Sequence, residues 1–183
     1  MTTDTLTDIA GDYTLDVSHS RLGFSARHAM VTKVRGQFGD FEGTARVDTA
    51  DPAASHVEVT IRPASISTGS EDRDNHLRSG DFFDVESFPT WTFTSTDVSR
   101  DGTTWTVAGN LTLKDATLPV SIDFEETGSA TDPFGNQRVG FEGELTINRK
   151  DWGLTWNAAL ETGGVLVSDK VQLDFDLSAI KAA

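Results

Sequence analysis

Apolar and polar residues alternate one by one in several stretches of the chain, and this pattern limits the fold more than any other feature. The clearest runs cover residues 57–61, 104–113, 118–124, 139–147 and 171–177. Successive side chains of a β-strand point to opposite faces, so each run predicts a strand with one buried and one solvated face. Parallel sheets have near-continuous apolar runs instead, which favours antiparallel pairing. With short turns between the runs, we expect an all-β, lipocalin-like antiparallel barrel of about eight strands.

The alternation changes phase once, near Gly39. Apolar or small residues occupy even positions from Leu22 to Phe38 and odd positions from Phe41 to Val47. A strand with a period of two cannot change faces without an extra residue, so a β-bulge or tight bend near Gly39–Asp40 would allow one long strand to curl around a barrel. A plain hairpin turn at Gly39 is the alternative.

One segment, residues 69–79 (GSEDRDNHLRS), has the composition of a short helix. Ser70 is placed to cap its amino end. The segment is too polar for a core helix, so we expect it to lie over one end of the barrel. No linker or repeat divides the chain, which predicts one domain over residues 12–180, after a disordered extension at residues 1–11.

The charge of the chain excludes several functions. Fifteen Lys and Arg against 29 Asp and Glu give a net charge of −14, which opposes binding to nucleic acid and lasting adhesion to an anionic membrane.

No run of about 18 apolar residues is present to span a membrane. Residues 1–10 lack the basic and apolar parts of a signal peptide, so we expect a cytoplasmic protein. An exposed strand edge or apolar rim would permit a homodimer.

Residues for metal binding or catalysis are sparse. The chain has no cysteine, and His19, His28, His56 and His76 lack the spacing typical of a metal site. No nucleophile-elbow, phosphate-loop or dinucleotide motif is present. Asp74 and His76 are the one candidate acid–base pair. We therefore expect no metal, no cofactor, no catalytic residue and no enzyme activity.

The face predicted to point inward combines small and aromatic residues. Glycine weakens a strand, so repeated inward glycine indicates either tight bending of the wall or space left for a ligand. An eight-stranded barrel has just enough room for one small ligand. Aromatic side chains therefore either line a pocket for an apolar molecule or fill the space completely. The inward small residues are Ala26, Gly36, Gly43, Ala45, Gly109 and Gly143.

The order of several short motifs resembles the YceI-like family over residues 12–177. The resemblance implies a lipocalin-like barrel that carries long isoprenoid or other lipid-like chains, and many members are exported. Lys114–Asp115 departs from the family where a glycine turn is common, and Trp152 stands where Phe is frequent. The motifs are Tyr13-x-Leu15-Asp16-x-x-His19-Ser20, Phe24, His28, Gly36-x-Phe38, Phe41-x-Gly43, Ser65-Ile66-x-Thr68, residues 73–78 (RDNHLR), residues 81–85 (DFFDV), Phe88-Pro89, Phe93, Gly109-x-Leu111-Thr112-Leu113 and residues 149–154 (RKDWGL).

Residues and resemblance together predict a protein that sequesters or carries a long apolar chain, such as a polyisoprenoid, an isoprenoid quinone or a fatty-acyl amphiphile. An enzyme acting on a lipid-like molecule and a stress-related barrel with a filled core are the alternatives. We expect Asp74 to anchor the helix, and Arg73 and His76 to lie at the mouth. The candidate cavity and mouth residues are Phe24, His28, Phe38, Arg73, His76, Leu77, Phe82, Phe83, Trp91, Phe93, Trp105, Leu111, Phe141, Trp152 and Trp156.

Overall fold

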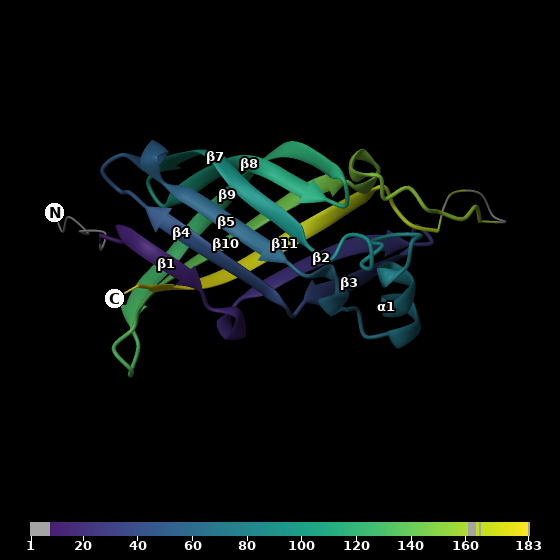
Figure 1. Ribbon diagram of the computed structural model, residues 1–183, viewed down its shortest axis with the longest axis horizontal. Helices are drawn as coiled ribbons and strands as arrows, with labels where there is room; N and C mark the ends of the chain where they lie inside the picture. The colour runs from purple at the N-terminus through teal and green to yellow at the C-terminus, as the bar shows by residue number, and fades with distance from the viewer. Residues whose placement is uncertain (1–7, 161–163, 165, 183) are drawn as a thin grey trace.

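Antiparallel strands make up most of the regular secondary structure in the computed structural model, which describes residues 8–160, 164 and 166–182 (Figure 1). Within these residues the single α-helix, α1, spans Glu71–Arg78, and short 3-10 turns follow several strands. The strands are β1 (Gly11–Leu15), β2 (Arg21–His28), β3 (Thr32–Phe38), β4 (Phe41–Val47), β5 (His56–Ile61), β6 (Ile66–Ser67), β7 (Trp91–Asp101), β8 (Thr104–Leu113), β9 (Ala116–Thr131), β10 (Gln137–Asn148) and β11 (Lys170–Lys181).

The strands close into a barrel, which confirms the predicted fold class. Its wall has eight staves, a stave being either one strand or two strands that lie in line and pair with the same neighbouring strand or stave. Strand pairing runs in the order β1-β4-β5-β7-β8-β9-β10-β11-β2-β3-β6, and β1 also pairs with β11. Residues 21–25 of β2 and residues 13–15 of β1 pair with successive parts of β11. These two strands therefore make one interrupted stave, and β3 with β4 makes the next.

The phase change near Gly39 is a bend between two strands of one stave. β3 pairs with β2 and β4 pairs with β1, whereas β3 and β4 do not pair with each other. The hairpin alternative is therefore wrong. The side chain of Arg62 fixes the bend by pairing with Asp40 at 3.1 Å and with Glu42 at 3.2 Å.

Helix α1 lies at the end of the barrel away from both termini (Figure 1). It starts as predicted, since the Ser70 hydroxyl accepts a hydrogen bond from the backbone N–H of Arg73. The β2–β3 turn and the long segment before β11 lie at the same end. We call this end, defined by α1, the β2–β3 turn and residues 153–160 and 166–169, the mouth end.

The core at the opposite end includes part of the expected disordered extension. Residues 1–7 lie outside the described part of the chain, but Ile9 is only 2% exposed and β1 already begins at Gly11. The Tyr13 hydroxyl donates to the Ile9 carbonyl at 2.8 Å. Ile9 packs against the core, so the last residues of the extension expected at residues 1–11 are ordered.

An ion cluster links the first stave to the β9–β10 turn. Arg138 contacts Asp16 at 2.6 Å and Asp132 at 2.8 Å. These contacts lower the pKa of both carboxyls, that of Asp132 to about 2. The cluster therefore stabilises the fold only while both carboxyls are ionised.

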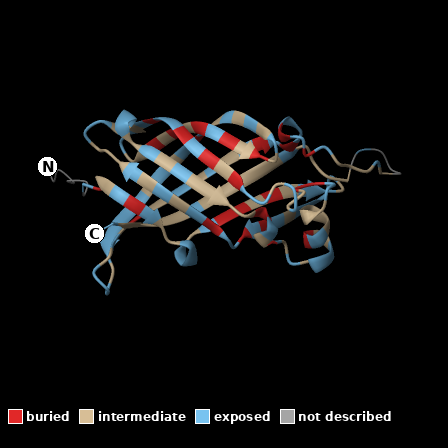
Figure 2. Ribbon diagram, in the orientation of Figure 1, coloured by how far each residue is buried: buried red, intermediate tan, exposed pale blue. Residues whose placement is uncertain are grey.

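Buried residues alternate with exposed ones along the strands (Figure 2). In β8 the buried residues are Trp105, Val107, Gly109, Leu111 and Leu113, at every second position. This is the predicted period of two, and it points one face of every stave toward a shared interior.

Candidate functional site

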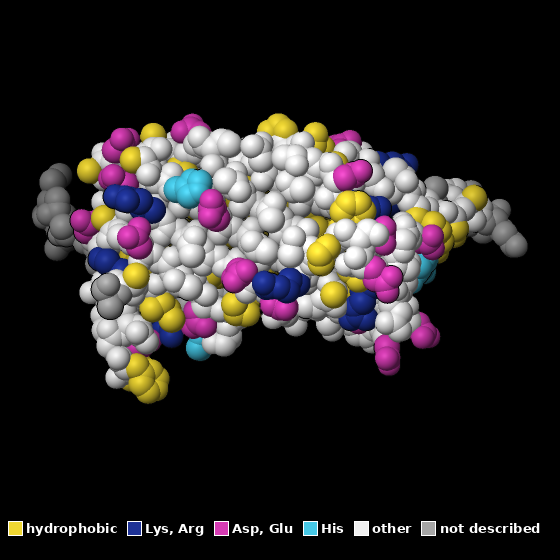
Figure 3. Space-filling view, in the orientation of Figure 1, with side chains coloured by type: hydrophobic (Ala, Val, Ile, Leu, Met, Phe, Trp, Pro, Cys, Tyr) yellow, Lys and Arg dark blue, Asp and Glu magenta, His cyan; other side chains and the backbone are white. Residues whose placement is uncertain are grey.

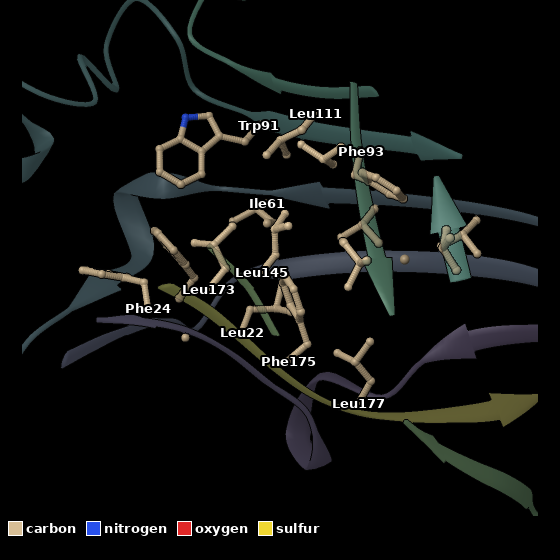
Figure 4. A pocket seen from close by; sticks show the side chains of 18 of the residues that line it. Leu22, Phe24, Ile61, Trp91, Phe93, Leu111, Leu145, Leu173, Phe175 and Leu177 are labelled. Atoms are coloured by element: carbon tan, nitrogen blue, oxygen red, sulfur yellow. The ribbon is translucent and has the colours of Figure 1, made fainter. Parts of the chain in front are cut away.

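The interior of the barrel encloses a cavity of about 280 Å³. Its lining is almost entirely apolar and comes from staves all around the ring. Figure 4 shows ten of these side chains converging on one space: Leu22, Phe24, Ile61, Trp91, Phe93, Leu111, Leu145, Leu173, Phe175 and Leu177. The aromatic residues therefore do not fill the interior completely.

Most of the candidate cavity residues line this space. They are Phe24, Phe38, Leu77, Phe82, Phe83, Trp91, Phe93, Trp105, Leu111 and Phe141. Trp152 does not line it: its side chain is buried in the surrounding core and donates from Nε1 to the Leu111 carbonyl at 3.0 Å. Trp152 therefore packs in the core beside the cavity lining, with its indole N–H paired to a backbone carbonyl.

The sequence-based list missed most of the aliphatic part of the lining, although it included Leu77 and Leu111. Leu145 on β10 and Leu173 and Leu177 on β11 all face the cavity. Their signal was present in the sequence, since all three belong to predicted period-two runs. The list favoured aromatic residues and left these aliphatic ones out.

Three inward glycines provide the space in which neighbouring aromatic rings pack. A Cβ atom on Gly109 would lie 2.6 Å from the Phe93 ring, and one on Gly143 would lie 2.8 Å from the Phe124 ring. Gly36 accommodates Phe24 in the same way. The idea that these three glycines leave room for a ligand is wrong, because neighbouring rings occupy that room.

Three other small residues do border the cavity: Ala26, Gly43 and Ala45. For these positions, the prediction that small inward residues leave space inside the barrel is consistent with the structure.

A second compartment, of about 440 Å³, lies at the mouth end. Its lining includes His28, Arg73, His76 and Trp156, the four remaining residues of the candidate list. It shares Phe24, Ala26, Leu77, Phe82 and Val167 with the barrel cavity. The two compartments are therefore adjacent, the inner one apolar and the outer one bordered by polar and charged side chains.

His76 is half-exposed on the mouth side of α1. Its ring meets Phe82 and Trp156 edge to face, with centroid distances of 5.1 Å and 4.6 Å. Its Nε2 atom lies 2.8 Å from an Asp81 carboxylate oxygen. The His76 ring therefore contacts two aromatic residues of the opening and also offers a hydrogen-bonding group there.

Asp74 is buried and faces away from the mouth, toward the segment before α1. Its Oδ1 accepts hydrogen bonds from the backbone N–H of Thr68 at 2.9 Å and from the Thr68 hydroxyl at 2.5 Å. Arg73 also contacts Thr68, from Nε to the hydroxyl oxygen at 2.7 Å. Asp74 and His76 thus have separate partners, so they do not form the acid–base pair considered from the sequence.

Arg149 is a buried cation that belongs to the RKDWGL motif but is absent from the candidate site residues. It is 3% exposed and lines the barrel cavity. Nε donates to the Ser168 carbonyl at 2.8 Å, and the Nη atoms donate to the carbonyls of Leu154, Trp156 and Val167. Burial lowers the pKa of Arg149, but a guanidinium remains charged at neutral pH. Arg149 therefore holds together the backbone segments that border the mouth.

One polar atom of the cavity wall has no hydrogen-bond partner among the described residues. It is Nε1 of Trp91, whose side chain packs edge to face against Phe38 and Phe83. Figure 4 shows this nitrogen on the side of the ring away from the labelled aliphatic residues. The rings around Trp91 therefore fix its orientation at the cost of an unpaired N–H group.

The described residues contain no group of three or more His, Asp or Glu side chains close enough to hold a metal ion. No helix in the described part of the chain is long and apolar enough to cross a membrane. The chemistry available at the site is apolar contact inside the barrel, with hydrogen bonding and charge at its opening.

Fold and site together define a class: antiparallel barrels closed around an apolar cavity. The model of the YceI-like domain matches residues 13–179, and the chain belongs to the YceI-like family. A UPF0312 protein of Pseudomonas aeruginosa is 41% identical over 148 residues, which cover 80% of this chain and 78% of that protein. Protein YceI of Salmonella newport is 40% identical over 149 residues, with the same coverage of both chains.

Solved structures show the same fold. A Campylobacter jejuni YceI protein has a TM-score of 0.73 at 28% identity, covering 86% of this chain and 90% of that one. Burkholderia cenocepacia BcnA has a TM-score of 0.78 at 24% identity, covering 90% and 98%. A polyisoprenoid binding domain from Saccharophagus degradans has a TM-score of 0.69 at 19% identity, covering 93% and 98%.

Proposed function

We propose that this protein binds one long apolar chain in the barrel cavity and sequesters or carries it. The ligand is a polyisoprenoid or a similar molecule, such as an isoprenoid quinone or a fatty-acyl amphiphile. The observation that carries the proposal is an apolar cavity that adjoins a compartment with polar and charged side chains at the mouth end of a closed barrel. The polyisoprenoid-binding domain that shares this fold supports the choice of ligand class.

The shape of the site suits an amphiphile with its chain inward. Each methylene group removed from water contributes about 0.8 kcal/mol, and the interior offers this gain without specific polar contacts. Any polar head then lies in the outer compartment beside Arg73 and His76, two residues that line it. Tyr13 and Trp105, both buried, line the inner part of the cavity.

The two alternatives are less well supported by the site. A filled-core barrel would leave no interior cavity, whereas about 280 Å³ is free here. An enzyme would need paired reactive groups, and Asp74 and His76 contact different partners. A binding protein without catalytic residues remains the better proposal.

The test is extraction of the purified protein with organic solvent, followed by mass spectrometry. Wild type should release a lipid in near-stoichiometric amount. Leu145→Trp should release much less, because Leu145 lines the cavity and the larger ring occupies ligand space. Thr146→Trp is the matched control, since Thr146 is exposed on the outer face of the same strand.

Two results would count against the proposal. Wild type that is free of lipid and takes up none from added polyprenol or fatty acid would contradict binding. Equal lipid content in Leu145→Trp and Thr146→Trp would show that the lipid is bound outside the cavity.

A further inference from the structure

The β2–β3 hairpin is a basic element in an acidic protein. Residues 21–38 contain four Lys and Arg and no Asp or Glu, although the whole chain has 15 basic and 29 acidic residues. Arg27, Lys33 and Arg35 are all exposed. They alternate with the inward residues of their strands, so they share the outer face of the hairpin.

Two of these cations lie directly opposite each other. Arg27 pairs with Lys33 in the register of the two strands, and like charges at facing positions destabilise a sheet. Arg27 donates to the Val31 carbonyl at 3.2 Å, and neither cation forms an ion pair with any described residue. The arrangement is unfavourable in solution and becomes favourable next to an external negative charge.

The tip of the hairpin exposes two adjacent apolar side chains. Met30 is 65% exposed and Val31 is 75% exposed. The turn closes through a hydrogen bond from Val31 N to His28 O at 3.1 Å. Ala29 and Met30 both have positive φ, 51° and 62°, a conformation that usually requires Asn or Gly. A strained turn that holds apolar side chains in water suggests a binding role.

This tip lies next to the opening of the cavity. His28 lines the outer compartment, and the Ala29 N–H donates to the Leu166 carbonyl at 2.7 Å. The turn is at the mouth end (Figure 1). Carboxylates are spread over the face that carries α1 (Figure 3), and Asp72 of α1 also lines the opening. A run of basic residues without acidic ones is thus a feature of this hairpin.

We propose that the β2–β3 hairpin docks on an anionic lipid bilayer and turns the mouth toward it. Met30 and Val31 enter the headgroup region, while Arg27, Lys33 and Arg35 meet lipid phosphates. Amphipathic elements with basic and apolar residues bind such surfaces in this way. The net charge of −14 opposes contact through acidic parts of the surface, so the hairpin leads and the contact is brief. This docking does not depend on which molecule the cavity holds.

The test is flotation of the intact protein with two kinds of vesicle, phosphatidylcholine alone and phosphatidylcholine mixed with phosphatidylglycerol. Wild type should bind only the mixed vesicles, and added salt should release it. The double variant Met30→Ser/Val31→Ser should bind at least about tenfold more weakly, because two apolar side chains no longer enter the bilayer. Its control is Val17→Ser/Phe134→Ser, which removes two other exposed apolar side chains.

The charge contribution is tested with single variants. Lys33→Gln should weaken binding about fivefold, the factor for one basic residue near an anionic surface. Arg21→Gln makes the same change in net charge at the far end of β2 and should have a smaller effect. Equal loss in these two variants, or flotation of Met30→Ser/Val31→Ser at the wild-type level, would overturn the proposal.

The lipid content of each variant, measured by solvent extraction, separates docking from ligand binding. Wild type that contains lipid but does not float with mixed vesicles would overturn the docking proposal and leave the proposed function standing. Wild type that floats but contains no lipid and takes up none from added polyprenol or fatty acid would overturn the proposed function and leave the docking proposal standing.

Discussion

Replacement of Arg149 by Met tests whether one buried cation holds the wall of the mouth together. Arg149→Met retains a long apolar side chain and removes the donors to four backbone carbonyls. Among the described residues, the carbonyls of Leu154 and Trp156 accept no other hydrogen bond. The substitution therefore leaves at least two buried acceptors unpaired.

The expected loss of stability follows from these acceptors. Each unsatisfied buried group costs about 1–3 kcal/mol, so two cost about 2–6 kcal/mol. Removal of the buried charge offsets part of this loss in stability, because the guanidinium no longer has to be desolvated on folding. We expect a net loss of about 2–4 kcal/mol, a large share of the 5–15 kcal/mol that is usual for a domain.

Urea unfolding followed by tryptophan fluorescence measures this loss. Lys150→Met is the matched control: its ion pair with Asp169, at 3.1 Å, joins two side chains that are each nearly half exposed. Such exposed pairs contribute about 0–1 kcal/mol. If Arg149→Met lowers the free energy of unfolding no more than Lys150→Met does, the four hydrogen bonds do not stabilise the fold as argued.

Further predictions concern the mouth, the cavity and the ion cluster. Asp74→Ala should lower the free energy of unfolding by about 1–3 kcal/mol, because its two donors lose their acceptor. His76→Ala should keep the melting temperature of wild type and change lipid affinity or head-group preference. Ala26→Phe should slow lipid uptake at unchanged fold, since this residue borders both compartments. The free energy of unfolding should fall as pH drops from the ordinary Asp132 pKa of 3.8 to its folded value of about 2, and Arg138→Gln should flatten that fall.

Each of these has a result that contradicts it. Early melting of His76→Ala with unchanged lipid content would make His76 an anchor. Wild-type stability in Asp74→Ala would remove its anchor role. Uptake by Ala26→Phe at the rate of the outward variant Gln37→Phe would separate this residue from the entry route. Equal acid sensitivity of Arg138→Gln and wild type would assign the pH dependence to other carboxyls.

The fold could be predicted because alternation and chain geometry are local properties. Period-two runs gave the staves, and the phase change at Gly39 gave the bend between β3 and β4. The helix boundaries followed from the cap at Ser70 and the polar composition after it. Which strand closes the ring could not be read in the same way, because the pairing of β1 with β11 joins residues far apart in the sequence.

The site was harder to predict, because burial and partners depend on packing. Trp152 and Trp105 are both buried tryptophans, yet only Trp105 borders the cavity. The sequence does not show that the space beside Gly109 is occupied by the Phe93 ring. Arg149 carries no pattern that marks a buried residue. A cytoplasmic location and a homodimer stay predictions, to be checked by cell fractionation and light scattering.

The closed hydrogen-bonded ring has a consequence for how a ligand would be selected. In a barrel, the number and tilt of the staves fix the diameter, and the pairing of β1 with β11 closes the ring. Chain length is less restricted, because a longer chain can extend further into the outer compartment. For the proposed ligand, thickness is therefore the strict criterion and length the lenient one. A fused-ring lipid as apolar as a polyprenyl chain should be rejected for its width alone.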